Sequence, residues 1–484
     1  MNTIKLIVTS LLLLDTWSAC VAATPDAKPN IVVILIDDMG YGDIGCFGSK
    51  LNRTPNLDRM ASEGMKMTSF YCAPLCTASR TQIMTGCYST RLAMPDVLFP
   101  CSITGINPNE KTIADLLKPQ GYATMIVGKW HLGDQPEFLP TRHGFDHYFG
   151  LPYSNDMGSE YRTKDTRIPP TPLVRDNKVI EAPAIQDTLT SRYTDEAVKF
   201  ITQNKDHPFF LYLAHTAVHR PWHPGSDFKG KSGNGLYGDW IEEMDWSVGR
   251  VLDTLRNLKL DKNTLVIFTS DNGGVLQDEH DKRGPTETSG KVSNAPLRGY
   301  KGTTFEGGMR ESSIAWWPGQ IAPGTISDVM MSEIDVLPTV VHLAGGAVST
   351  DRKIDGLDIW PVLSGQSQTS PHEALFYWRS FKADAVRSGP WKLSVHREIF
   401  GKDPEAKKYP GQKSEGIELY NLDKDIGETT NVAAQNPDVV KRLKALIDAI
   451  QEEIGKKGPR TGVRPAGHVK NPKPLMLRTV AEYD

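Results

Sequence analysis

The run of residues 30–36 (NIVVILI) constrains the fold most, because an extended segment of this composition presents apolar side chains on both faces. A strand of this kind must be covered on both sides, which is typical of the central strands of a largely parallel sheet. Residues 209–214 (FFLYLA) have the same character, and shorter strand candidates lie at 123–127 and 265–268. Helical patterns alternate with these strands at 55–63, 111–117 and 237–258. The alternation predicts an α/β domain with a large sheet flanked by helices.

The pattern changes after about residue 370. Short strand candidates at 375–378, 385–395 and 418–422 follow one another without helices between them, and one amphipathic helix is predicted at 438–454. This order indicates a smaller C-terminal domain, with an antiparallel sheet and a helix packed on it. We therefore predict three parts of the chain: an N-terminal segment, a large α/β domain and the smaller domain, over residues 1–23, 24–365 and 366–484.

The N-terminus has the features of a secretory signal. Residues 6–14 (LIVTSLLLL) form an apolar stretch after Lys5, too short for a stable membrane anchor, and residues 21–23 (VAA) are suitable for cleavage. Export to the periplasm, the extracellular space or the lysosome is expected. Lipoprotein processing at Cys20 is the alternative, although Trp17 is a poor match to its signal.

The remaining composition excludes several classes of protein. Fifty-five Lys and Arg residues against 58 Asp and Glu residues leave a net charge of −3, so no basic excess favours nucleic acid. No later apolar run reaches membrane-spanning length, so no membrane span is expected. Five cysteines remain after the signal, and in an oxidising compartment this odd number leaves at least one unpaired or modified. They are Cys46, Cys72, Cys76, Cys87 and Cys101.

Two of the predicted strands end in oxygen-bearing side chains. Asp37 and Asp38 follow the run at 30–36, and Asp271 and Asn272 follow the strand at 265–268. Ligands of open α/β sheets bind at the carboxyl ends of the strands, where these oxygens would suit Ca²⁺ or Mg²⁺. No Cys or His pair with zinc-ligand spacing accompanies them. Each pair alone is more typical of turns or helix caps than of a metal site, but their joint occurrence at two strand ends favours a metal site.

A third constellation is the segment 76–86 (CTASRTQIMTG). Cys76 precedes a predicted helix, whose first N–H groups favour anions, and Arg80 adds a cation one turn later. A buried or disulfide-bonded cysteine is the competing interpretation. The segment resembles the C-x-P/A-x-R signature of the sulfatase family, and residues 121–133 (GYATMIVGKWHLG) resemble its second signature. The resemblance covers most of residues 28–345 and, more loosely, the C-terminal region. Ala78 stands where proline is more usual, which leaves the maturation enzyme open.

The resemblance implies an alkaline-phosphatase-like fold and a nucleophile made by a maturation enzyme that oxidises Cys76 to formylglycine (3-oxoalanine). One hydroxyl of the hydrated aldehyde would attack sulfur, and deprotonation of the other would expel sulfate. One divalent cation is implied, with Ca²⁺ preferred and Mg²⁺ possible. Its implied ligands are Asp37, Asp38, Asp271, Asn272 and residue 76.

The family also implies roles for basic residues. Arg80 and Lys129 would hold the formylglycine and the neighbouring ligands, and His131 would be the base that breaks down the sulfo-enzyme. Lys129 and His131, at positions i and i+2, would face the same side of a strand-like segment. The histidine that serves the leaving oxygen is expected to be His219.

Further substrate contacts remain less firmly assigned. His215 and His223 are alternatives to His219. Lys301 resembles the second sulfate-binding lysine of the family, and Ser154 is a weaker candidate for substrate contact. Loops at 134–201 and 274–298 are expected to wall the pocket. Candidate sugar contacts within the second loop, with solvated loop residues as the alternative, are Gln277, Asp278, Glu279, His280 and Arg283.

The predicted function is release of sulfate from sulfated carbohydrate or aryl sulfate, like that of arylsulfatases and N-acetylgalactosamine sulfatases. Two alternatives remain: a phosphate mono- or diester hydrolase of the same superfamily, and a non-catalytic protein that binds sulfated glycans. The sugar, the position of its sulfate and the oligomeric state are left open. Asn52-Arg53-Thr54 matches a glycosylation acceptor, which applies to a eukaryotic source.

Overall fold

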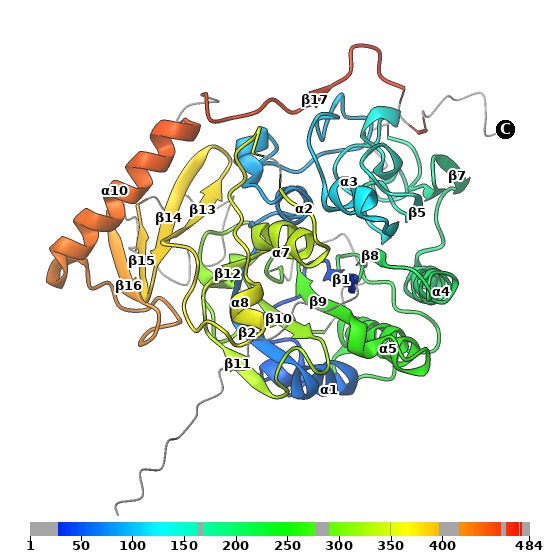
Figure 1. Cartoon of the computed structure of the whole chain (residues 1–484), viewed down its shortest axis with the longest axis horizontal. Helices are drawn as coiled ribbons and strands as arrows, with labels where there is room; N and C mark the ends of the chain where they lie inside the picture. Colours follow the sequence, from blue (N-terminus) through cyan, green and yellow to red (C-terminus); the bar gives the residue numbers. More distant parts are fainter. Residues whose placement is uncertain are drawn as a thin grey trace, which may run out of the picture.

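A computed structural model describes residues 28–162, 168–275, 290–348, 350–395, 416–455, 461–473 and 475–476. The predicted signal at 1–23 and the candidate sugar contacts within 277–283 lie outside these residues. Figure 1 shows a large central sheet with helices on both faces and a smaller sheet with one helix beside it. The predicted α/β class is therefore observed.

The large sheet has eleven strands in the order β11-β2-β10-β9-β1-β8-β4-β5-β6-β7, with β12 paired to β2. Its centre is parallel, and β10 pairs antiparallel with both β9 and β2. The strands are β1 (Asn30–Ile36), β2 (Met65–Tyr71), β4 (Ala123–Gly128), β5 (His147–Gly150), β6 (Leu173–Arg175), β7 (Lys178–Glu181), β8 (Phe209–Ala214), β9 (Thr264–Ser270), β10 (Arg310–Trp316), β11 (Thr325–Ser327) and β12 (Met331–Ser332).

Alternate side chains of β1 enter two different apolar clusters, as the double-sided composition of this strand predicts. Val32, Ile34 and Ile36 pack on one face with helices α1, α4 and α5, whereas Ile31 and Val33 pack on the other face. The second face is covered by α2, α3, α7 and α8. The helices are α1 (Pro55–Glu63), α2 (Cys76–Thr85), α3 (Ile113–Leu117), α4 (Leu189–Gln203), α5 (Gly235–Asn257), α6 (Glu306–Met309), α7 (Val336–Leu343) and α8 (Trp360–Leu363).

The C-terminal part contains a four-stranded antiparallel sheet with α10 (Pro437–Ile454) packed against it. Its strands are β13 (Leu375–Arg379), β14 (Lys382–Ser388), β15 (Trp391–Ser394) and β16 (Glu418–Asn421). The prediction of one strand over 385–395 was wrong, because Gly389 adopts a left-handed φ of 57° and Pro390 follows it, so the chain turns between β14 and β15.

The segment after α10 returns to the part of the chain that contains the large sheet instead of staying with the smaller sheet. Its strand β17 (Gly467–His468) pairs with β3 (Thr104–Gly105), and the segment crosses the top of Figure 1. The two strands are far apart in the sequence, so a local pattern does not reveal their pairing. A nearby hydrogen bond from Asn107 to Pro465 O joins residues that are 358 positions apart.

A buried ionic group joins the two parts. Lys392 of β15 lies 3.0 Å from Glu306 Oε1 and 2.8 Å from Glu428 Oε1, and all three side chains are buried. Burial alone would raise the pKa of Glu306, but Lys392 and Arg310 lower it to about 2, so the carboxylate is charged. The interface between the two sheets therefore depends on paired buried charges.

The structure shows the surroundings of the predicted glycosylation acceptor and of the cysteines. Asn52 is buried, donates a hydrogen bond to Asp43 O and accepts one from Asn234, so the matched glycosylation acceptor is not accessible. No disulfide bond joins any two cysteines within the described part of the chain.

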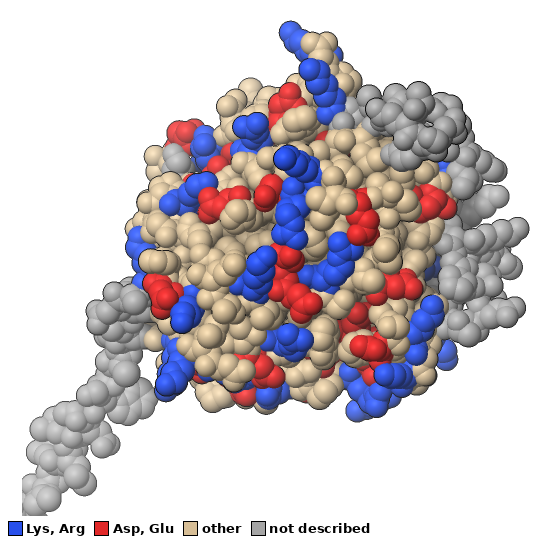
Figure 2. All heavy atoms as spheres, turned by 90° about the vertical axis from the view of Figure 1, so that its right-hand side faces the viewer, with Lys and Arg blue, Asp and Glu red and all other residues tan. Residues whose placement is uncertain are grey.

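Two further observations concern the apolar character of the helices and the distribution of charge on the surface. None of the helices in the described segments combines the length and the apolar character needed to cross a bilayer. Figure 2 shows positive and negative side chains interspersed on the face that it presents.

Candidate active site

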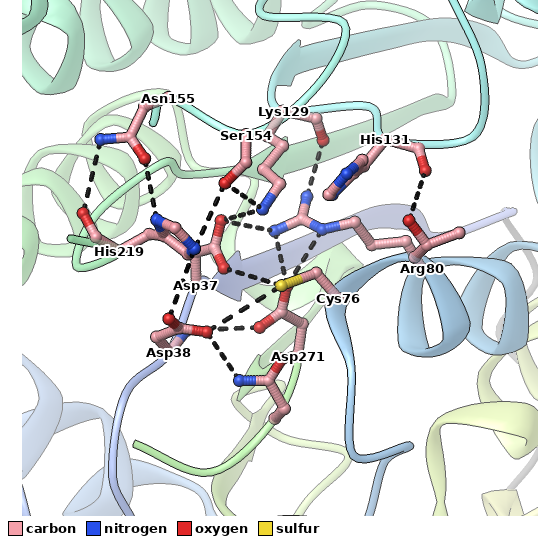
Figure 3. Close-up of polar contacts among 12 residues, drawn as sticks. Asp37, Asp38, Cys76, Arg80, Lys129, His131, Ser154, Asn155, His219 and Asp271 are labelled. Carbon is pink, nitrogen blue, oxygen red and sulfur yellow. Dashed lines mark hydrogen bonds and ion pairs between the residues drawn. The ribbon is translucent and has the colours of Figure 1, made fainter. Parts of the chain in front are cut away.

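The predicted pairs of oxygen-bearing residues meet at one edge of the sheet. Strands β1 and β9 are parallel neighbours in the register Ile36↔Ser270, so Asp37 and Asp271 leave the sheet side by side. Asp271 N donates to Ile36 O at 2.9 Å, and Asn272 Nδ2 donates to Asp38 Oδ1 at 2.7 Å. All four side chains are buried. The carboxyl ends of these strands thus form the polar floor of one site (Figure 3).

Cys76 is the first residue of α2 and points at this floor (Figure 3). Its Sγ lies 3.5 Å from Asp37 Oδ1, 3.9 Å from Asp38 Oδ1 and 3.1 Å from Lys301 Nζ. Burial and the nearby carboxylates of Asp271 and Asp37 raise the pKa of the Cys76 thiol. The unmodified side chain is therefore held as a neutral thiol among charged groups.

Three cations balance the carboxylates, of which Arg80 and Lys129 are buried and Lys301 is partly exposed. Arg80, one turn after Cys76, donates from Nε and Nη2 to Asp271 Oδ2 at 3.0 and 2.9 Å. Lys129 Nζ lies 2.5 Å from Asp37 Oδ2 and 3.2 Å from Ser154 Oγ, and Lys301 Nζ lies 2.5 Å from Asp38 Oδ1. Burial opposes ionisation of Asp37, but Lys129, His219 and Arg80 hold its pKa well below the ordinary value.

The backbone before Lys129 is fixed by a glycine. Gly128 ends β4 with a φ of +110°, and a Cβ built on it would lie 1.8 Å from Ala214 O. The close approach lets Lys129 N donate to the same carbonyl at 2.7 Å, which fixes the start of the lysine segment.

His219 is the histidine that reaches the site. Its Nε2 lies 3.3 Å from Ser154 Oγ and 3.6 Å from Asp38 Oδ2, whereas Nδ1 faces Asn155 Oδ1 at 2.9 Å and Arg220 O at 2.6 Å. Both neighbours of Nδ1 are acceptors, so the proton of a neutral ring resides on Nδ1 and the Nε2 lone pair faces the site. Burial lowers the pKa of His219, although Asp38 opposes the shift.

The two alternative histidines lie elsewhere. His215 is buried against Ser247 Oγ, which lies 3.1 Å from its Nε2, and His223 pairs with Asp187. Asn155, which sequence reasoning missed, orients His219. Its position directly after Ser154 was the available signal, but only the fold shows that its amide meets the imidazole (Figure 3).

His131 lies in the same region without a direct polar contact to Cys76 or Lys129 among the described residues. Its Nε2 faces Leu98 O at 3.0 Å, and its buried Nδ1 has no hydrogen-bond partner within the described segments. Its φ is +64°, so the segment after β4 is not extended there, and the predicted i, i+2 arrangement of Lys129 and His131 on a strand is not formed. Burial, Lys129 and Arg80 lower the pKa of His131 well below its ordinary value.

The residues present fit a hard divalent cation. Potential ligand atoms of Asp37, Asp38, Cys76 and His219 lie within 4.8 Å of one another. In addition, Asn272 Oδ1 is buried and has no hydrogen-bond partner in the described part of the chain. A buried oxygen without a donor, beside several carboxylates, indicates that a cation belongs there.

These features define an alkaline-phosphatase-like fold with a cluster of potential metal ligands at the carboxyl ends of its strands. The sulfatase family profile matches residues 29–347, and that of the C-terminal region of aryl-sulfatase matches residues 370–465. The chain belongs to the sulfatase family and is a sulfuric ester hydrolase, as its sequence motifs predicted.

The relatives extend over nearly the whole chain. N-acetylgalactosamine-6-sulfatase of Mus musculus is 39% identical over 480 residues, which cover 91% of this chain and 89% of that protein. Arylsulfatase A of Homo sapiens is 38% identical over 452 residues, which cover 86% and 87%. Among solved structures, the PsFucS1 sulfatase from Pseudoalteromonas sp. superposes with a TM-score of 0.78 at 28% identity, covering 88% of this chain and 90% of that one.

Proposed function

We propose that this enzyme releases sulfate from esters of a sulfated carbohydrate, with a formylglycine made from Cys76 as nucleophile and a divalent cation beside it. The position of Cys76 carries the proposal. Cys76 is the first residue of α2, and its side chain points at Asp37 and Asp38. Its Sγ lies 3.1 Å from Lys301 Nζ. The names of the mouse and human relatives support a sulfated sugar or an aryl sulfate as substrate.

The modified residue would supply a hydroxyl that attacks sulfur and an aldehyde that can be regenerated afterwards. The cation, which we expect to be Ca²⁺ or otherwise Mg²⁺, would supply Lewis-acid stabilisation of charge on the sulfate. We assign Asp37, Asp38, Asp271, Asn272 and residue 76 to hold it. His219 belongs to the geometric cluster too, but its bonds to Asn155 and Arg220 aim Nε2 at the position of a leaving oxygen.

The basic residues would divide the remaining work. Lys301 and Lys129 stabilise negative charge on the sulfate and at residue 76, and Arg80 fixes the Asp271 carboxylate through two N–H groups. His219 would take up a second proton at Nε2, which the Asp38 carboxylate 3.6 Å away favours, and transfer that proton to the leaving oxygen, and Ser154, bonded to Lys129, contacts the sulfate. His131 is assigned the proton from the hydroxyl that does not attack, because its Nε2 faces Leu98 O and its Nδ1, without a partner among the described residues, is left as an acceptor nitrogen.

The alternatives gain no support from the site. Two-metal phosphate hydrolases need a second set of carboxylate and histidine ligands, whereas a single cluster with ligand spacing occurs among the described residues. A binding protein would not require a convertible cysteine beside a metal site.

The proposal is tested on one tryptic digest. Protein co-expressed with a formylglycine-generating enzyme should yield the peptide 67–80 with residue 76 as an aldehyde and Cys72 as an unmodified thiol. An intact thiol at residue 76 in material that releases sulfate would contradict the mechanism. The same digest tests our proposal that residues 1–23 are removed on export, since the mature chain would begin at Thr24.

Chelation should abolish sulfate release, because Asp37, Asp38 and Asp271 would then face the sulfate without a compensating dication. Activity should return with Ca²⁺ or Mg²⁺, and the ion that restores it at the lower concentration identifies the natural one. Circular dichroism before and after chelation separates loss of the ion from unfolding. Full activity of chelated, metal-free protein would show that the cation is not required.

A further inference from the structure

A cavity of about 560 Å³ opens over the candidate site and is larger than a sulfate group requires. Asp38, His219 and Lys301 line its inner end. The other lining residues come mainly from two loops and form what we call the outer wall: Asp156, Glu160, Tyr161, Arg162, Arg220, Pro221 and Val275. The first of these loops lies within residues 134–201, which the sequence predicted to wall the pocket.

Tyr161 gives the outer wall an aromatic surface that is fixed in place. The residue is 37% exposed, and its hydroxyl lies 2.8 Å from His223 Nε2. His223 Nδ1 faces the Asp187 carboxylate at 2.7 Å, so Nδ1 carries the proton and Nε2 accepts from the phenol. Gln186 Nε2 donates to the same hydroxyl at 3.3 Å. The ring therefore needs little ordering when a ligand arrives.

The same support continues to the catalytic histidine. Gln186 exchanges hydrogen bonds with Asn155, whose Oδ1 receives the Nδ1 proton of His219. The position of the Tyr161 ring relative to His219 is therefore set by a chain of buried amides, not by loop motion. A ring that rests on Tyr161 would have a defined position relative to the group that serves the leaving oxygen.

Asp156 and Arg162 give the outer wall a matched acceptor and donor. Arg162 Nη2 lies 3.8 Å from Asp156 Oδ2, which is too long for a hydrogen bond, and its guanidinium lies 5.2 Å from the centre of the exposed Phe99 ring. Both side chains line the cavity and are partly exposed, Arg162 by 34% and Asp156 by 16%, whereas the atoms Asp156 Oδ1 and Arg162 Nε are buried without a hydrogen-bond partner in the described part of the chain. A carboxylate only accepts and a guanidinium only donates, so together they suit hydroxyl groups, which do both.

We propose that Tyr161, Asp156 and Arg162 form a subsite that recognises the hydroxyl-bearing pyranose ring of the sulfate ester. One face of the ring packs on Tyr161, and neighbouring hydroxyls bond to Asp156 and Arg162 while the sulfate reaches Lys301. The inference rests on the proposed function and extends it: the enzyme selects sugar sulfates over aryl sulfates, which lack these hydroxyls. The opposite charges of Asp156 and Arg162 favour neutral hydroxyls over a second anionic group.

The experiment compares kcat and KM on two substrates, p-nitrophenyl sulfate and the best pyranose sulfate from a panel of 2-, 3-, 4- and 6-sulfated galactose, glucose and their N-acetylamino forms. Asp156→Asn should lower kcat/KM for the pyranose sulfate by ~10- to 100-fold, mainly through KM, because a charged hydrogen bond to substrate is lost. The loss on p-nitrophenyl sulfate should be much smaller, because that substrate offers no hydroxyl.

Tyr161 is tested with a matched pair. Tyr161→Ala should lower kcat/KM for the pyranose sulfate by ~3- to 10-fold, whereas Tyr161→Phe keeps the ring and should retain most of the activity. Equal losses on both substrates in Asp156→Asn, or unchanged kinetics on the pyranose sulfate, would overturn the subsite. So would hydrolysis of p-nitrophenyl sulfate with no activity on any pyranose sulfate. Wild-type enzyme inactive on both substrates would instead refute the proposed function.

Discussion

Cys76→Ala should lower sulfate release by ~10⁴-fold or more, because removal of a covalent nucleophile leaves only binding and charge stabilisation. The methyl group cannot be converted to an aldehyde, and it places no oxygen between Asp37 and Lys301. Released sulfate is measured at saturating substrate in material matured under the same conditions as the wild type. Turnover close to wild type in this variant would refute covalent catalysis at residue 76.

Cys76→Ser sharpens this test. A serine hydroxyl could accept one sulfate, but it has no second hydroxyl whose deprotonation expels the product. Single-turnover experiments should therefore show at most one leaving group released per site and no sustained sulfate release. Cys72→Ser is the matched control, since Cys72 is also a buried cysteine but bonds to Met309 O and Glu311 instead of the site. It should keep turnover within a few-fold, with thermal melting reporting any loss of fold.

Lys392→Met should destabilise the protein by ~3–5 kcal/mol, because it leaves the buried carboxylates of Glu306 and Glu428 without their shared cation. Methionine keeps the approximate length of the side chain, so the effect isolates charge. The midpoint of urea unfolding measures it. Lys444→Met is the control, since the Lys444–Asp448 pair on α10 is half-exposed and contributes about 0.5 kcal/mol or less. Equal midpoints for the two variants would contradict a stabilising role for the buried group.

This substitution should also reach the active site. Glu428 accepts a hydrogen bond from Glu306 N at 2.8 Å through Oε2, and its carbonyl accepts one from Arg298 at 2.9 Å. These two contacts hold both ends of the segment that carries Lys301. The smaller sheet therefore supports the lysine that contacts Cys76, and weakening of the interface should raise KM for sulfate esters.

Much of the active-site floor could be predicted from the sequence because it is local to strand ends and one helix start. Asp37 and Asp38 directly follow a strand whose apolar composition requires burial on both faces, and Cys76 and Arg80 are one helical turn apart. Parallel neighbours place their carboxyl ends at the same edge, so even the meeting of Asp37 with Asp271 followed from strand pattern alone. The family motifs then predicted Lys301 and His219, and both lie at the site.

Other features depended on contacts between distant segments. These contacts lie between loops that have no periodic pattern. They are the contact of His131 with Leu98, that of Asn155 with His219, and the hydrogen bonds that link Tyr161, His223 and Asp187. The return of β17 to β3 is likewise a pairing of distant backbone groups.

Local sequence patterns were enough to predict the alternation of buried strands and helices, the position of Cys76 at a helix start and the charges next to it, because each depends on neighbouring residues. Three features became visible only in the folded chain: the contact of Asn155 with His219, the side chains of the outer wall and the position of Lys392 between the two sheets. The physical reason is that loop conformation and packing between domains are set by the sum of many weak long-range contacts, whereas strand and helix periodicity follows from local backbone geometry.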